Sequence, residues 1–198
     1  MASFKPLALV LSLLPVVASA QESTPDFRPG QWALQFGGNL NLATFGIMRF
    51  SSPRSALVLN VDLTASFMNG KTTDPFGGSS DANDHTALIQ GSLGKRFYQS
   101  VRSKVRSFQT IGIVGGYVDQ KVTFSPTTTS RSKSVFGGLQ GEVGGGYWLS
   151  SNLSLGGTAS ARVAYSHQES SQSGGFSRTQ HGFGISGVNV TLVLGLYF

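Results

Sequence analysis

Apolar and polar side chains alternate at every second residue over long segments of this chain. The alternation is clearest over residues 55–68 and recurs over residues 134–149 and 153–166. In the first of these segments the apolar parity consists of Leu57, Leu59, Val61, Leu63, Ala65 and Phe67. Successive side chains of a β-strand point to opposite faces, so the pattern predicts strands with one apolar face and one mostly polar face.

The same pattern, followed along the chain, predicts an all-β fold of eight strands. We expect these strands at residues 30–38, 41–50, 55–68, 84–97, 107–123, 134–149, 153–166 and 181–198. The fifth is the least regular, because Ile111 and Ile113 have the opposite parity to Val114 and Val118. A very short link, around residues 38–40, separates the first two strands.

The connections between these strands alternate in length. Tight turns are expected at residues 51–54 and 150–152, and residues 98–106 have the same position in the order of connections. Longer stretches rich in Gly, Ser, Thr and Asp are expected to form loops at residues 69–83, 125–133 and 168–180. Short turns at one rim and longer loops at the other are typical of transmembrane barrels. The sequence therefore predicts a closed, antiparallel, up-and-down transmembrane β-barrel.

Composition narrows the possible functions. Charged residues make up 12% of the chain, against about 25% in an ordinary soluble domain. The chain has no cysteine, which excludes a disulfide scaffold, a Cys-ligated metal and a thiol nucleophile. Its net charge is +6, but the basic residues are sparse and scattered, so nucleic acid is not an expected partner.

The first twenty residues have the pattern of a cleaved secretory signal peptide. Lys5 precedes an apolar run over residues 6–17, and Ala18-Ser19-Ala20 follows it. This run is shorter than the roughly 20 residues that a transmembrane helix needs. We therefore expect a signal peptide at residues 1–20, a short periplasmic lead-in at 21–29 and a barrel at 30–198. An exported chain without another long apolar segment can span a membrane only as a closed barrel.

A soluble barrel would also have alternating apolar and polar side chains. The positions of the charged residues therefore decide between a soluble and a transmembrane barrel. Asp62, Glu142 and Arg162 lie in mid-strand on the polar parity. If that parity faced water, the opposite parity would have to fill the core, and its many glycines and alanines would pack poorly. If it faces inward, the charges can pair while the apolar parity contacts lipid.

The last residues resemble a known sorting signature. The chain ends at Phe198, preceded by Tyr197, and Leu196, Leu194 and Leu192 share the parity of the terminal residue. This ending resembles the C-terminal signal of bacterial outer-membrane β-barrel proteins. Together with the strand number, it makes the chain similar to the small eight-stranded outer-membrane barrels. The resemblance implies location in the bacterial outer membrane, contact with its lipids, and insertion by the barrel-assembly machinery.

The three interior charges form the first candidate site. Antiparallel pairing about the 150–152 turn places Arg162 diagonally near Glu142, and Asp62 can reach in from the third strand. A hydrogen-bonded network would satisfy charges held within a narrow barrel. We interpret this network as a structural plug of the barrel. The alternative is that it forms a selectivity constriction in a pore.

An enzymatic site is a further alternative. His167, Glu169 and Ser170 combine a base, a carboxylate and a hydroxyl, which are the groups needed for acyl transfer. Lipid A deacylases are similar barrels with a His-x-Ser motif, but here the serine follows one residue too late. A one-residue slip turns a strand side chain to the opposite face. The segment is therefore interpreted as a polar loop stem.

Two further clusters carry charge. Asp74, Asp81 and Asp84 are oxygen ligands of the kind that suits Ca²⁺, and we leave open whether their loop binds an ion. Basic residues gather at Lys95, Arg96, Arg102, Lys104 and Arg106. This second cluster is interpreted as a solvated turn, with attraction to anionic lipid headgroups as the alternative.

The expected function is a non-enzymatic outer-membrane barrel that displays polar extracellular loops, for surface stability, adhesion or contact with an unknown extracellular ligand. The first alternative is a narrow porin or small-solute channel. The second is an enzyme that modifies lipid A or phospholipid. No catalytic residue, cofactor or metal is predicted.

Overall fold

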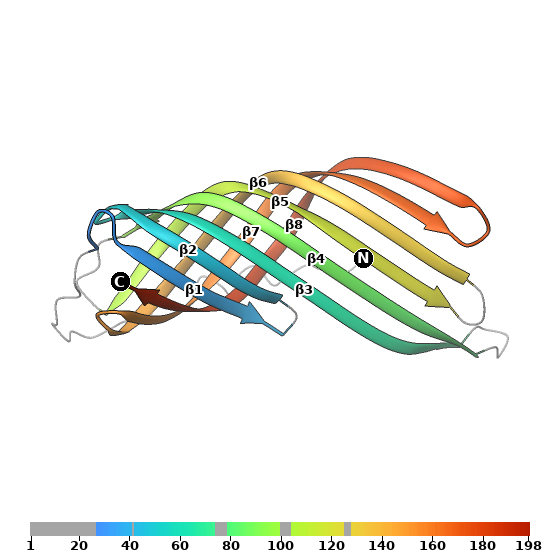
Figure 1. The fold of residues 1–198 in the computed structure, drawn as a ribbon, viewed down its shortest axis with the longest axis horizontal. Helices are drawn as coiled ribbons and strands as arrows, with labels where there is room; N and C mark the ends of the chain where they lie inside the picture. Colours follow the sequence, from blue (N-terminus) through green and yellow to red (C-terminus); the bar gives the residue numbers. More distant parts are fainter. Residues whose placement is uncertain (1–26, 41, 74–78, 100–103, 125–127) are drawn as a thin grey trace, which may run out of the picture.

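The computed structural model describes residues 27–40, 42–73, 79–99, 104–124 and 128–198, and it confirms the predicted closed barrel of eight strands. The strands are β1 (Trp32–Asn39), β2 (Leu42–Ser52), β3 (Ser55–Thr73), β4 (Ser79–Tyr98), β5 (Val105–Phe124), β6 (Thr128–Ser150), β7 (Leu153–Gln172) and β8 (Phe176–Tyr197). Each pairs antiparallel with its neighbours in chain order (Figure 1). Within the described ranges there is no helix long and apolar enough to cross a membrane.

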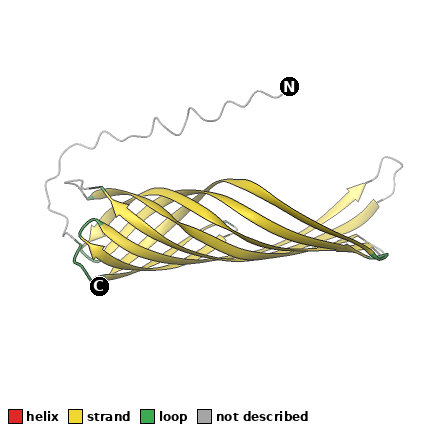
Figure 2. Cartoon of the chain, turned by 90° about the horizontal axis from the view of Figure 1, so that it is seen from above, coloured by secondary structure: helices red, strands yellow, loops and turns green. Residues whose placement is uncertain are grey.

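The ring closes where β1 pairs with β8, from Ala33 opposite Tyr197 to Gly38 opposite Leu192. Two further backbone hydrogen bonds join Trp32 and Phe198, at N–O distances of 3.1 and 3.0 Å. The resulting cylinder is visible from the side in Figure 2. Over the paired stretch each strand has two neighbours, as hydrocarbon requires of backbone N–H and C=O groups.

The two faces of the wall differ as the alternation predicts. On β3, Leu57 and Leu63 are about half exposed, at 54% and 52%, whereas Val58 between them is 1% exposed. The irregular parity of β5 also has an explanation. Ile111 and Ile113 face outward, and Val114 on the opposite parity is buried inside. Apolar side chains therefore occupy both faces of β5, which hides the period-two signal.

The outward apolar residues form a belt as tall as a membrane. On β3 the belt runs from Leu57 to Phe67, ten residue steps or about 33 Å along the strand. At a strand tilt of about 40° this gives a height of about 25 Å, the height of the apolar band in outer-membrane barrels. Beyond Phe67 the same parity continues as Asn69 and Lys71, which are polar and exposed. The belt therefore ends at Phe67.

The strands at one end are much longer than predicted. The stretches expected to be loops at 69–83, 125–133 and 168–180 belong mostly to strands of three paired hairpins. The connection of β7 to β8 is only residues 173–175, where Gly174 and Gly175 have φ of 115° and 87°, a conformation that favours glycine. The prediction was wrong because these polar strands have no apolar face. We call this the hairpin end and the opposite rim the short-turn end.

The hairpin of β1 and β2 stops well below the others. β1 ends at Asn39 and β2 begins at Leu42, whereas β3 continues to Thr73 (Figure 1). The described pairs between β2 and β3 end at Leu63. In the part of the chain that the structure describes, β3 beyond this point and β8 before Leu192 are therefore paired on one side only.

Aromatic rings fill the short-turn end of the barrel. Phe27 comes from the predicted lead-in, and its ring lies 4.0 Å from Phe50, 4.8 Å from Tyr98 and 5.7 Å from Tyr197, measured between centroids. Trp148 completes the aromatic cluster at 5.9 Å. The predicted signal peptide, residues 1–20, lies outside the described residues and remains a prediction.

The belt predicts how an inserted charge acts at different heights. We expect Val61→Arg, near mid-belt, to lower the free energy of unfolding from lipid vesicles by about 2–4 kcal/mol. Ser171→Arg, exposed on the hairpin end, should change it by less than about 0.5 kcal/mol. Urea titration of the refolded barrel gives both values, and equal effects of the two substitutions would contradict the belt.

Candidate functional site

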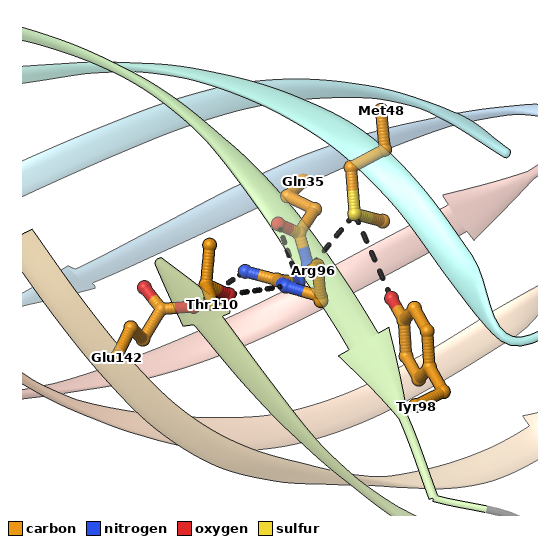
Figure 3. A network of polar contacts seen from close by, with 6 residues as sticks. All are labelled: Gln35, Met48, Arg96, Tyr98, Thr110 and Glu142. Atoms are coloured by element: carbon orange, nitrogen blue, oxygen red, sulfur yellow. Dashed lines mark hydrogen bonds and ion pairs between the residues drawn. The ribbon is translucent and has the colours of Figure 1, made fainter. Parts of the chain in front are cut away.

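A buried arginine organises the barrel interior. Arg96 is 1% exposed and projects from β4 into the lumen (Figure 3). Its guanidinium donates hydrogen bonds to Gln35 Oε1 at 3.1 Å, Thr110 Oγ1 at 3.0 Å and Glu142 Oε1 at 2.5 Å. Thr110 Oγ1 also donates to Glu142 Oε1 at 3.1 Å. The charge of Arg96 is thus neutralised by Glu142 on β6, two strands away.

Less polar groups complete the layer around this ion pair. The Arg96 guanidinium carbon lies 3.9 Å from the centroid of the Phe108 ring, within cation–π range. The sulfur of Met48 accepts hydrogen bonds from Arg96 at 3.4 Å and from the Tyr98 hydroxyl at 3.6 Å (Figure 3). With the aromatic cluster beside it, this layer fills the barrel on the side of the short-turn end.

A second polar network lies closer to the hairpin end. Arg162 donates to Gln90 Oε1 and, at 2.6 Å, to Ser186 Oγ. Gln90 in turn donates from Nε2 to Asp62 Oδ2 at 2.7 Å. The guanidinium also lies 4.3 Å from the Phe136 ring centroid. A cavity of about 160 Å³ is lined by residues of both networks, including Gln90, Arg96, Glu142 and Arg162.

The structure places the three predicted residues, Asp62, Glu142 and Arg162, on the inner face, but with different partners. The expected partner of Glu142 is Arg162, whereas the ion pair of Glu142 is with Arg96. Arg162 contacts the uncharged side chains of Gln90 and Ser186. Strand register explains this, because Arg162 lies directly opposite Gln140 and its long side chain extends toward β4 rather than toward Glu142.

Arg96 and Arg106 are interior residues that were not predicted from the sequence. Both were assigned to a solvated basic turn, and both are buried, at 1% and 6% exposure. Arg106 packs with its guanidinium carbon 4.6 Å from the Phe27 ring centroid. The alternation could have identified Arg96 as an interior residue, because Arg96 has the same inward parity as Gln90. Lys95 has the outward parity and lies 5.4 Å from the Phe97 ring centroid, whereas Arg102 lies outside the described residues.

The C-terminal residues divide between the two faces. Leu194 and Leu196 face outward, as does Phe198 beyond the strand, with 37%, 38% and 66% exposure. Tyr197 faces inward, and its hydroxyl lies 3.1 Å from Ser154 Oγ. Their predicted role as an assembly signal remains a prediction.

The candidate acyl-transfer residues lie on opposite faces of β7. His167 faces outward, where its Nε2 lies 3.2 Å from Glu169 Oε1. Ser170 has the inward parity and donates to Ser132 Oγ at 3.5 Å. The hydroxyl is therefore directed away from the histidine that would have to activate it.

The acidic cluster is only partly described. Asp74 and the side chain of Asp81 lie outside the described residues. Asp84 faces inward and accepts hydrogen bonds from Gln120 Nε2 at 3.2 Å and Thr86 Oγ1 at 3.3 Å. Among the described side chains, no group of three or more His, Cys, Asp or Glu residues is placed to hold a metal ion.

The hairpin end carries an exposed ion pair above the belt. Arg131 donates two hydrogen bonds to the Asp119 carboxylate, at 3.0 and 2.6 Å. These bonds hold the pKa of Asp119 below its ordinary value. The stabilisation from the pair is therefore present above an unfolded-state pKa of about 3.9 and is lost as the pH falls through the lower folded-state pKa.

The Arg96–Glu142 pair predicts a large cost for removing one partner. We expect Arg96→Met to lower the free energy of unfolding by about 3–5 kcal/mol, because it leaves the carboxylate of Glu142 buried without its cation. Adding Glu142→Gln should recover part of this loss. Denaturant titration of the single and double variants measures the coupling. Strictly additive effects would show that the two side chains do not interact.

Comparison with known proteins supports the fold. No family model and no curated protein matches the chain. The structure is similar to that of a major outer membrane protein from Thermus thermophilus, with a TM-score of 0.57 and 13% identity over 85% of this chain and 98% of that chain. Two other similar structures overlap too weakly to carry an argument. Acinetobacter baumannii CarO2 has a TM-score of 0.46 and 8% identity over 85% of this chain and 98% of its own. Yersinia pestis Ail has a TM-score of 0.43 and 10% identity over 85% and 94%.

These observations agree on one architecture. The ring is closed, its outward belt is apolar over the height of a bilayer, and Arg96 and Glu142 form an ion pair inside. The fold is shared with the Thermus protein. The chain therefore has the fold of a small bacterial outer-membrane β-barrel protein.

Proposed function

We propose that the protein is a non-enzymatic outer-membrane barrel that holds a polar β-sheet beyond the membrane for contact with an extracellular ligand. The observation that carries this proposal is the length of β3 to β8, all of which continue past the belt. On β7 the edge of the belt is marked by the aromatic residue Tyr165. Gln172 lies seven residue steps, or about 23 Å of strand, beyond it.

The projecting strands are mostly polar on both faces, and Phe176 on β8 is an exposed exception. On β7 the outward parity holds His167, Glu169 and Ser171, and the inward parity holds Ser166, Gln168 and Ser170. A sheet of this composition has no apolar face to bury against a core of its own. Its continuity with the barrel holds it in place, and its surface suits a hydrophilic partner.

The edges of this sheet offer a mode of contact. In the described part of the chain, β3 beyond Phe67 and β8 before Phe183, which is opposite Tyr165 at the belt edge, pair on one side only. An extended segment of a partner can add to such an edge through backbone hydrogen bonds. This supports recognition of a protein or peptide over recognition of a small solute.

The filled interior supports display over conduction. The Arg96 layer and the aromatic cluster around Phe27 occupy the barrel toward the short-turn end. An eight-stranded barrel has room for little more than its own side chains. The opposite orientations of His167 and Ser170 likewise weigh against the lipid-modifying alternative.

The filled interior predicts an electrically silent protein. Purified barrel added to planar lipid bilayers should produce no discrete conductance steps at physiological salt, because side chains block the lumen. A heat-unfolded sample is the control for artefacts of detergent. Reproducible single-channel steps from the folded barrel alone would favour the porin alternative.

Site-directed labelling tests the proposed display. Because the chain has no cysteine, an introduced cysteine is its single reactive thiol. We expect Ser171→Cys, on the hairpin end, to react with a membrane-impermeant maleimide on intact cells. Ser151→Cys, exposed at the short-turn end, is the matched control and should react only after the outer membrane is disrupted. The reverse labelling pattern would place the hairpin end in the periplasm and refute the proposal.

A further inference from the structure

Two of the three histidines of the chain face each other across β7 and β8. His167 and His181 are directly opposite in the strand register. Their Nδ1 atoms lie 2.9 Å apart, and their ring centroids lie 4.6 Å apart. Neither the proposed display function nor the filled interior requires this arrangement.

A carboxylate orients one of the two rings. Glu169 Oε1 lies 3.2 Å from Nε2 of His167 and accepts the proton of that nitrogen in a hydrogen bond. The Nδ1 atom of His167 then carries a lone pair, and Nδ1 of His181 donates to it. A carboxylate bonded to the far nitrogen of an imidazole is the usual support of a metal-binding histidine, because it sets the tautomer and raises ligand basicity.

The separation of the two Nδ1 atoms suits a particular coordination geometry. Two nitrogens at about 2.05 Å from one ion lie about 2.9 Å apart when they subtend a right angle, and about 3.3 Å apart at the tetrahedral angle. The observed 2.9 Å is a hydrogen-bond distance, and it also equals the separation of adjacent positions of a square-planar or octahedral ion. Among ions that imidazole binds, this geometry is typical of Cu²⁺ and Ni²⁺.

The surroundings leave the pair accessible. The side chain of His167 is 41% exposed, just past the aromatic edge of the belt. Tyr165 packs against His181, with centroids 6.4 Å apart, and contacts Phe183 edge-on at 5.1 Å. These rings form an apolar base below the histidines and leave their outer side open.

We propose that His167 and His181 form a surface site for Cu²⁺ or Ni²⁺, with Glu169 as the positioning residue for His167. The proton on Nδ1 of His181 moves to its Nε2 through solvent, so that both Nδ1 lone pairs turn to the ion through small χ2 rotations. The remaining coordination positions hold water. The bound ion clamps β7 to β8 at the base of their projecting hairpin.

Copper titration of the untagged, detergent-refolded barrel tests this site. We expect one Cu²⁺ per chain, with an electron paramagnetic resonance spectrum showing coupling to two imidazole nitrogens. His167→Ala and His181→Ala should each weaken binding at least tenfold and reduce the coupling to one nitrogen. Glu169→Gln should weaken binding about tenfold while both nitrogens remain coupled.

The third histidine is a matched control. His85 faces outward on β4, with its ring 5.2 Å from that of Phe67 and far from the pair in the strand order. His85→Ala should leave the affinity and the spectrum unchanged. Equal weakening by His85→Ala, or unchanged binding in His167→Ala, would overturn the proposal.

Assembly of each variant is checked by its heat-modifiable mobility on gels. If an alanine variant does not form the barrel, the corresponding asparagine variant replaces it, since asparagine keeps a polar side chain on the exposed face. Loss of the two-nitrogen spectrum in an assembled variant supports the site. Retention of that spectrum in both assembled variants excludes it.

Discussion

The pairing of β1 with β8 is the contact on which the rest of this molecule depends. Inside hydrocarbon an unpaired backbone N–H or C=O costs several kcal/mol, so a sheet can enter lipid only when its two edges meet. Here they meet over a short stretch, from Ala33 opposite Tyr197 to Gly38 opposite Leu192. Closure in turn assigns each parity of each strand to lipid or to the lumen.

A closed ring of eight strands is narrow, and this determines what its interior holds. Every inward side chain must pack against the opposite wall or bond to it. Arg96 bonds to Gln35, three strands away on β1, and to Glu142, two strands away on β6. The same requirement explains why Phe27, which precedes the first strand, packs into the short-turn end. The interior is thus a small polar core with an aromatic base.

The period-two pattern predicts the structure best within the apolar belt. Between Leu57 and Phe67 the strand, its faces and the inward position of Asp62 followed from alternation alone. Beyond the belt, water contacts both faces and no apolar parity is selected, so the pattern predicts loops where the structure has strands. Arg96 was misassigned for a different reason. Its charged neighbours near a turn suggested solvent, although its parity pointed inward.

The sequence by itself determined the fold class, the number of strands and the direction in which each mid-strand charge points, because these depend on the period-two pattern within one strand. Only the tertiary structure decided which charge meets which. The partners of Glu142 and Arg162, and the approach of His167 to His181, depend on register between strands and on reach across the lumen. Register and reach are properties of the closed ring, and no single strand contains them.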